Sequence, residues 1–173
     1  MKRAMKRVLP FLLVLLLCLA GCGGKKEFPD TVNCSTILEA AQKAAADLPA
    51  FENRYTDAEG NLDAYTLSLF ADGKYTECEE YGLLDGYARY LSGGTTTYEI
   101  DVLKAADQAG AAKLEELLSR RMQSMRSGDK AMYDPEFERR MSDALLYRDG
   151  LYAILLITDD NNAARDAIDA LKQ

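Results

Sequence analysis

Four cysteines and no histidine set the chemistry that this 173-residue chain can do. Without an imidazole the chain lacks the Ser-His-Asp and Cys-His nucleophile systems and the usual zinc and haem ligand. Among the cysteines, Cys22 has the most distinctive neighbours. The small residues Ala20 and Gly21 before it would let a peptidase reach the backbone, and its thiol is the only strong nucleophile nearby.

Residues 1–21 have the three parts of a secretory signal peptide, which are a basic leader, an apolar core and small residues before a cleavage point. An apolar core over residues 8–20 follows a basic leader, whose cations are Lys2, Arg3, Lys6 and Arg7. This core contains Pro10 and is shorter than the roughly 20 residues that a stable membrane span needs. A cleaved leader is therefore favoured over an uncleaved anchor helix.

The sequence Leu19-Ala20-Gly21-Cys22 resembles the bacterial lipobox at every position. The resemblance implies that a diacylglyceryl group is transferred to the Cys22 sulfur and that the chain is then cleaved before Cys22. Two acyl chains give durable attachment, whereas one would be marginal. We therefore expect a lipid-anchored protein on the extracytoplasmic face of the bacterial plasma membrane, with the membrane as its partner through Cys22.

The predicted leader is basic, whereas the rest of the chain is acidic. All 28 acidic residues lie after Cys22 but only 17 of the 21 basic ones do, so the net charge of −7 becomes −11 for the expected mature chain. Such a domain lacks the clustered basic surface that binds phosphates, and we expect no nucleic-acid partner. We assign residues 22–33 to the lipidated cysteine and its tether and residues 34–173 to a single domain.

Two cysteines, Cys34 and Cys78, remain in the expected mature domain. The compartment outside the membrane permits disulfides, but spacing alone does not fix connectivity, so a Cys34–Cys78 bridge and two buried or idle thiols are alternatives. The acidic residues at 57–63 lack the glycine and terminal glutamate of an EF-hand. We expect neither a metal nor a cofactor.

Residue periodicity predicts an α+β fold with a small antiparallel sheet and helices packed on one face. The main predicted helices lie over residues 36–48, 107–126 and 161–171, and the clearest strands over 98–103, 144–148 and 151–158. Asp149-Gly150 favours a type I′ hairpin turn. A two-residue loop there would pair Arg148 with Leu151, Tyr147 with Tyr152, and Leu145 with Ile154.

The hairpin pairing would place Tyr147 and Tyr152 side by side, and Tyr133 could lie near them. Such a cluster could stack on a sugar or a peptide. The alternative, which we favour, is a sheet face in which cross-strand aromatic pairs serve stability.

Arg121 falls in the middle of the apolar stripe of the helix predicted over residues 107–126, which is formed by Leu114, Leu117, Leu118 and Met125. A cation in this position must extend to water, pair with an acid or bind an anionic ligand. Because a lone buried charge is costly, we favour a structural ion pair over anion recognition. The candidate partners are Asp101, Asp143 and Glu138.

Several short motifs occur in a suggestive order. They are Tyr-Gly-Leu-Leu-Asp (81–85), Tyr-Glu-Ile-Asp-Val-Leu-Lys (98–104), Leu-Leu-Ser-Arg-Arg-Met-Gln (117–123), Tyr-Asp-Pro-Glu (133–136) and Asp-Gly-Leu-Tyr-Ala-Ile-Leu-Leu-Ile (149–157). With the lipobox leader, the chain resembles the "domain of unknown function 4358" family of Firmicutes lipoproteins over residues 35–170. The resemblance implies a cell-surface lipoprotein of Gram-positive bacteria, but no activity and no catalytic residues.

The sequence favours a non-enzymatic, membrane-anchored module that binds a protein or small-molecule partner. One alternative is a histidine-free hydrolase that acts on envelope polymers through Asp and Glu. A deep cleft holding two carboxylates with raised pKa values would favour that enzyme. Another alternative is a lipid-anchored accessory subunit of a membrane complex, which an exposed apolar patch would favour.

The anchor is tested by replacing Cys22 with alanine. The variant should be released from the membrane or keep its leader, because the thiol that accepts the lipid is gone. Membrane fractionation and the mass of the chain measure both outcomes. Unchanged anchoring and processing would contradict the lipid anchor.

Overall fold

The computed structural model describes residues 26–45, 48–49, 51–74 and 76–173. The predicted signal peptide, Cys22 and most of the predicted tether lie outside these residues. None of the helices within the described ranges is long and apolar enough to cross a membrane.

Five strands form one antiparallel sheet in the order β1-β2-β3-β5-β4. Their bounds are Phe51–Thr56 for β1, Leu84–Ser92 for β2, Glu99–Ala105 for β3, Leu145–Asp149 for β4 and Tyr152–Ile157 for β5. The central strand β3 pairs with both β2 and β5, so that Asp101 lies between Arg89 and Leu155. The predicted α+β class with an antiparallel sheet is confirmed.

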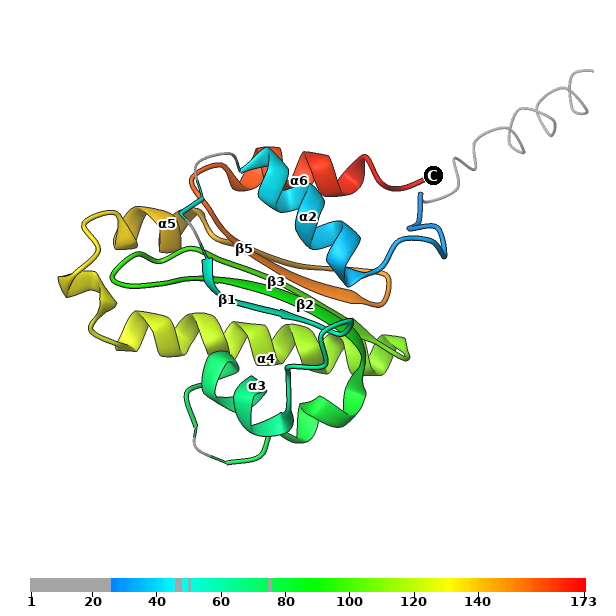
Figure 1. Cartoon of the computed structure of the whole chain (residues 1–173), viewed down its shortest axis with the longest axis horizontal. Coiled ribbons are helices and arrows are strands. Elements are labelled where there is room, and N and C mark those ends of the chain that lie inside the picture. The colour runs from blue at the N-terminus through cyan, green and yellow to red at the C-terminus, as the bar shows by residue number, and fades with distance from the viewer. Residues whose placement is uncertain (1–25, 46–47, 50, 75) are drawn as a thin grey trace, which may run out of the picture.

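Helices cover both faces of this sheet (Figure 1). One face carries α2 (Cys34–Ala44) and α6 (Asn161–Asp169), and the other carries α3 (Ala64–Ala71) and the long helix α4 (Gln108–Ser127). The expectation that helices pack on one face is therefore wrong. The physical reason is that β5 is buried along its whole length, as is most of β3, and strands with two apolar faces need cover on both.

The two faces hold separate apolar cores. Helix α4 places the stripe that the sequence predicts, Leu114, Leu117, Leu118 and Met125, against Leu103 and Leu155 of the sheet. On the opposite face, α2 and α6 pack against a second set of strand residues, among them Ile100, Ile154 and Leu156. The alternation of side chains along each strand divides its residues between the two cores.

Helix α4 begins where the sequence predicts. Asp107 is its N-cap, and the Asp107 carboxylate accepts a hydrogen bond from the backbone N–H of Gly110 at 2.7 Å. After α4 a short 3₁₀ turn, η2 (Lys130–Met132), leads into α5 (Phe137–Asp143). Helix α5 turns Phe137 and Met141 into the core beneath α4.

The β4–β5 hairpin differs from its prediction by one residue. Asp149 lies opposite Tyr152, so the turn residues are Gly150 and Leu151, and Tyr147 lies opposite Ile154. Gly150 has φ of 57°, whereas Leu151 does not have a positive φ. A positive φ at the first central residue alone is typical of a type II′ turn, and the expected type I′ turn is wrong. The Cβ of Leu151 explains this, because a side chain disfavours the second positive φ that type I′ requires.

The first described residues lie beside the C-terminus. The backbone N–H of Glu27 donates to the Gln173 carbonyl at 3.3 Å, and the Gln173 N–H donates back to Glu27 at 3.1 Å. Figure 1 shows the C-terminus at one end of the long axis and the last turn of α4, with α5, at the other. The segment that follows the predicted anchor therefore joins the domain opposite the α4–α5 connection.

Candidate functional site

Two networks of arginine and carboxylate side chains, buried except for Arg121 and Asp159, meet the start of β3. The first, here called the central network, consists of Arg89, Glu99, Asp101 and Arg121. The second, called the end network, consists of Asp134, Arg140, Tyr98 and Asp159. Between them runs the α4–α5 connection, residues 128–136.

The central network follows from strand alternation. Glu99 and Asp101 point to the α4 face of β3, and Arg89 of β2 lies directly opposite Asp101. The guanidinium of Arg89 is fully buried, and it donates to Asp101 through Nε and Nη2 and to Glu99 through Nη2. The Nη2 distances to Asp101 Oδ2 and to Glu99 Oε1 are both 3.1 Å. A charge in this position is tolerable only because it is paired.

Arg121 completes the central network from α4. Its Nε and Nη2 donate to both oxygens of Glu99, with an Nη2–Oε2 distance of 2.7 Å. The expected structural ion pair is therefore present, but the three acids named for it are wrong. Asp101 is already held by Arg89, and Asp143 lies on α5, 3.9 Å from Arg139.

The two carboxyl groups of the central network differ in pKa. Burial raises the pKa of Asp101 to about 7, and the adjacent Glu99 carboxylate adds to the effect of burial against the opposing effect of Arg89. Burial would also raise the pKa of Glu99, but Arg121 and Arg89 hold it below its usual value. Below pH 7 the two arginines therefore outweigh the ionised carboxylates.

A deep cleft holding two carboxylates with raised pKa values was the feature that would favour a hydrolase, and this pair does not match it, because the pKa of Asp101 is raised and that of Glu99 is lowered. Glu99 is 1% exposed and Asp101 is fully buried. A group that exchanges protons with a substrate must come within hydrogen-bonding distance of it. Enclosed by their arginine partners, these two carboxyl groups hold β2, β3 and α4 together.

The end network is built around Asp134, the first residue after the exposed Tyr133. One Asp134 oxygen accepts the backbone N–H of Thr97 at 2.8 Å, and the other accepts the N–H of Glu136 at 3.0 Å. Arg140 Nη1 donates to both Asp134 oxygens, at 2.9 and 2.8 Å. Burial would raise the pKa of Asp134, but these hydrogen bonds hold it below its usual value.

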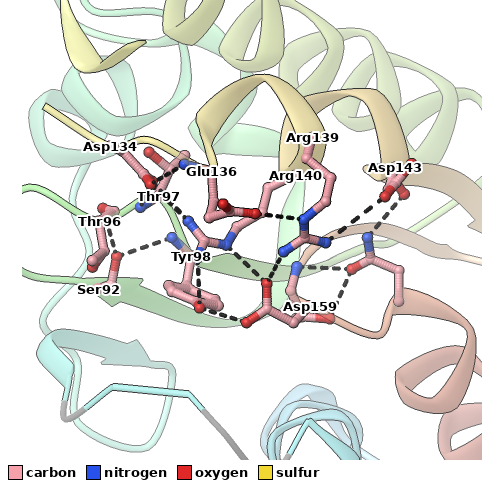
Figure 2. Close-up of polar contacts among 12 residues, drawn as sticks. Ser92, Thr96, Thr97, Tyr98, Asp134, Glu136, Arg139, Arg140, Asp143 and Asp159 are labelled. Atoms are coloured by element: carbon pink, nitrogen blue, oxygen red, sulfur yellow. Dashed lines mark hydrogen bonds and ion pairs between the residues drawn. The ribbon is translucent and has the colours of Figure 1, made fainter. Parts of the chain in front are cut away.

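Figure 2 shows how Arg140 extends this network across the start of β3. The guanidinium carbon lies 4.0 Å from the centre of the Tyr98 ring, and Nη2 donates to the Tyr98 hydroxyl at 2.8 Å. Arg140 Nε reaches Asp159 at 3.0 Å, and the Tyr98 hydroxyl donates to the same carboxylate at 2.6 Å. The connection after α4 is thereby fixed to β3 and to the segment that follows β5.

The α4–α5 connection exposes large apolar side chains to solvent. Within the described part of the chain, Met132 at 78% and Tyr133 at 61% are the most exposed large apolar side chains. Beside them lies an open pocket of about 350 Å³, here called the distal pocket, which is lined by Arg121, Met125, Gly128, Asp129, Lys130 and Tyr133. Exposed apolar residues on a connection held at both ends are typical of a binding surface.

The structure brings Arg121 and Tyr133 together but places the other two candidate tyrosines elsewhere. Tyr147 and Tyr152 belong to the core beneath α2 and α6. Tyr147 lies under the guanidinium of Arg165, 4.8 Å from ring centre to carbon. Tyr152 donates its hydroxyl hydrogen bond to the Val32 carbonyl at 3.1 Å. These two tyrosines pack against the sheet, but the expected cross-strand pair between them is not formed, because Tyr147 lies opposite Ile154 and Tyr152 lies opposite Asp149.

Tyr152 also borders a pocket of about 300 Å³ that is lined in part by Glu27 and Phe28, here called the proximal pocket. Phe28 meets the Tyr152 ring edge to face, with 5.1 Å between ring centres, and Lys104 lines the same pocket.

The two cysteines of the domain are free thiols in different cores. Cys34 is the first residue of α2 and belongs to the core on that face of the sheet, whereas Cys78 belongs to the core beneath α4, so the sheet separates them. The Cys34–Cys78 bridge is therefore not formed. Burial raises the pKa of Cys34 to about 12 and that of Cys78 to about 11, so neither is a reactive thiolate at neutral pH.

Sequence reasoning missed Arg89, Glu99, Arg140 and Lys130. Two signals were available. Glu99 and Asp101 share a strand face with Leu103, which requires a buried cation if that face is covered. Arg140 lies between the buried Phe137 and Met141 on one helical turn. Lys130 carries no comparable signal, because only the folded connection places it beside Arg121.

Compared with protein-family models, with curated proteins and with solved structures, the chain has no match. The resemblance to the domain of unknown function 4358 family stays a prediction.

Replacing Glu99 with alanine should lower the free energy of unfolding by about 3–5 kcal/mol, because Arg89 and Arg121 lose a buried partner. The matched control is Glu39→Ala, which breaks the exposed Arg54–Glu39 pair and should cost about 1 kcal/mol or less. Denaturant unfolding of both variants measures the difference. Equal losses would show that the central network is not what joins α4 to β3.

The raised pKa of Asp101 predicts an unusual pH dependence of the free energy of unfolding. Because its pKa is raised to about 7 in the folded chain, Asp101 contributes stability that is fully present below about pH 4, its pKa in the unfolded chain, and is lost as the pH rises through 7. With no histidine in the chain, few other side chains titrate between pH 5 and 8. The free energy of unfolding should fall over this range, by at most about 1.4 kcal/mol per pH unit.

Denaturant unfolding at several pH values measures this slope, and Asp101→Asn should flatten it. A wild-type profile that is already flat would mean that Arg89 keeps Asp101 ionised throughout.

Proposed function

We propose that this protein is a lipid-anchored module on the extracytoplasmic face of the plasma membrane that binds a small-molecule ligand in its distal pocket. The lipobox around Cys22 supports the anchor. The observation that carries the binding role is a pocket with two cationic side chains and an exposed tyrosine, on a connection held by the central and end networks.

The position of the predicted anchor relative to the two pockets favours the distal pocket as the ligand-binding site. Five residue steps separate Cys22 from Glu27, and a fully extended chain of that length reaches about 17 Å. Glu27 and Phe28 line the proximal pocket, which the tether would hold close to the membrane. The distal pocket is lined by residues of α4 and of the α4–α5 connection. That connection lies at the other end of the long axis (Figure 1).

The networks also favour binding on energetic grounds. A loop that must become ordered when ligand arrives loses conformational entropy at that moment. Here Arg121 is held by Glu99 at one end of the connection, and Asp134 is held by Arg140 and Thr97 at the other. The connection therefore loses its conformational entropy during folding, and less of the binding free energy is spent on ordering it when a ligand binds.

Cysteine labelling on intact cells tests this arrangement. Met132→Cys should react rapidly with a bulky, membrane-impermeant maleimide, because residue 132 is exposed and far from the anchor. Lys26→Cys, beside the anchor, should react more slowly. The wild-type chain is the background control, because Cys34 and Cys78 are buried and Cys22 would carry lipid.

Labelling of Met132→Cys only after cell lysis would contradict the extracytoplasmic location. Faster labelling at residue 26 than at residue 132 would contradict the proposed orientation.

A further inference from the structure

Two cations face the distal pocket. Arg121 uses Nε and Nη2 for Glu99, and within the described residues its Nη1 makes no hydrogen bond. Its side chain is 14% exposed, and it lines the pocket. A guanidinium with one edge fixed by a carboxylate presents its remaining donors in a defined direction, which suits recognition of an anionic oxygen.

Lys130 is the second cation, and its ammonium is poorly compensated. It is half-buried, and no carboxylate in the described chain forms an ion pair with it. Burial, and after it the neighbouring Arg121, lowers the pKa of Lys130, while Glu99 and Asp134 act in the opposite direction. A partly desolvated ammonium next to a second cation gains from an anion placed between them.

Two further lining residues, Asp129 and Tyr133, suit a hydroxylated ring better than a bare anion. The carboxylate of Asp129 would repel one, but it can accept hydrogen bonds from hydroxyl groups. The exposed Tyr133 ring offers an apolar, aromatic face of the kind on which a sugar ring packs. A volume of about 350 Å³ is at the small end of ligand pockets and accommodates a ligand of monosaccharide size.

We propose that the distal pocket binds an acidic monosaccharide, with the carboxylate between Arg121 and Lys130, the ring against Tyr133 and a hydroxyl donating to Asp129. The proposal rests on the proposed function and names the ligand class of that same pocket. Because the expected mature chain carries a net charge of −11, the rest of its acidic surface does not attract such a ligand, which confines binding to this cationic site.

Three sugars that share one ring form test the charge preference, with the full chain purified in detergent and titrated by calorimetry. Glucuronate is anionic, glucose neutral and glucosamine cationic. Glucuronate should bind at least about tenfold more tightly than glucose, the value of one charge-assisted hydrogen bond, and glucosamine should bind most weakly. Inorganic phosphate, an anion without a ring, should bind more weakly than glucuronate.

Variants on the connection separate the two parts of the site. Lys130→Gln should weaken glucuronate binding about tenfold and leave glucose binding unchanged, because only the charge contact is lost. Tyr133→Ala should weaken both sugars by the same factor. Lys74→Gln and Tyr65→Ala, at exposed positions on or next to α3, are the matched controls and should change neither. Lys130 and Tyr133 are not members of either network, so unfolding measurements should show the fold intact.

Equal or tighter binding of glucose or glucosamine would overturn the proposal, as would phosphate binding as tight as that of glucuronate. Absence of saturation by glucuronate at about 10 mM would also overturn it. The labelling of Met132→Cys does not depend on the ligand, so the proposed function and the ligand class fail independently.

Discussion

The buried guanidinium of Arg89 is the constraint on which the rest of this structure depends. A cation sealed inside a sheet must be neutralised, and its two partners come from β3 as Glu99 and Asp101. Two carboxylates exceed the need of one cation, and Arg121 of α4 balances the second. Such a network adds little net stability over a well-packed apolar core, whereas removing one member is costly. Its consequence here is positional, because α4 has one place in which Arg121 reaches Glu99.

The end network applies the same logic to the other side of the connection. Immediately before β3, the backbone N–H of Thr97 donates to Asp134, and Arg140 donates to the Tyr98 hydroxyl. On β3 itself, Glu99 accepts from Arg121. One strand therefore positions the last turns of α4 and the start of α5, and the residues between them have no freedom to fold back onto the core. Met132 and Tyr133 stay exposed, and Lys130 is held beside Arg121. The tether joins the opposite end, so that the fold presents this surface away from the membrane in the proposed arrangement.

The sequence predicts the local elements of this fold well and its long-range pairings poorly. Helix α4 and its Asp107 cap, strand β3 and the β4–β5 hairpin follow from periodicity and turn residues. The hairpin register differs from the prediction by one residue, because Gly150 and Leu151 form the turn in place of Asp149 and Gly150. Arg121 was identified as a buried cation, but its partner required knowing that β2 places Arg89 against Asp101. The unbroken apolar run of β5 indicates cover on both faces of the sheet, but it does not show which face each cysteine lies on, so the separation of Cys34 and Cys78 could not be predicted.

The central claim is that ligand binding occurs at the connection that the two networks hold. Chemical-shift mapping of backbone amides during titration with glucuronate locates the bound sugar directly. The account predicts that the largest changes fall within residues 121–133, while residues 27–32 and 149–152, around the proximal pocket, stay unchanged. Changes concentrated around Phe28 and Tyr152 would contradict the account and would place the binding site at the anchor end.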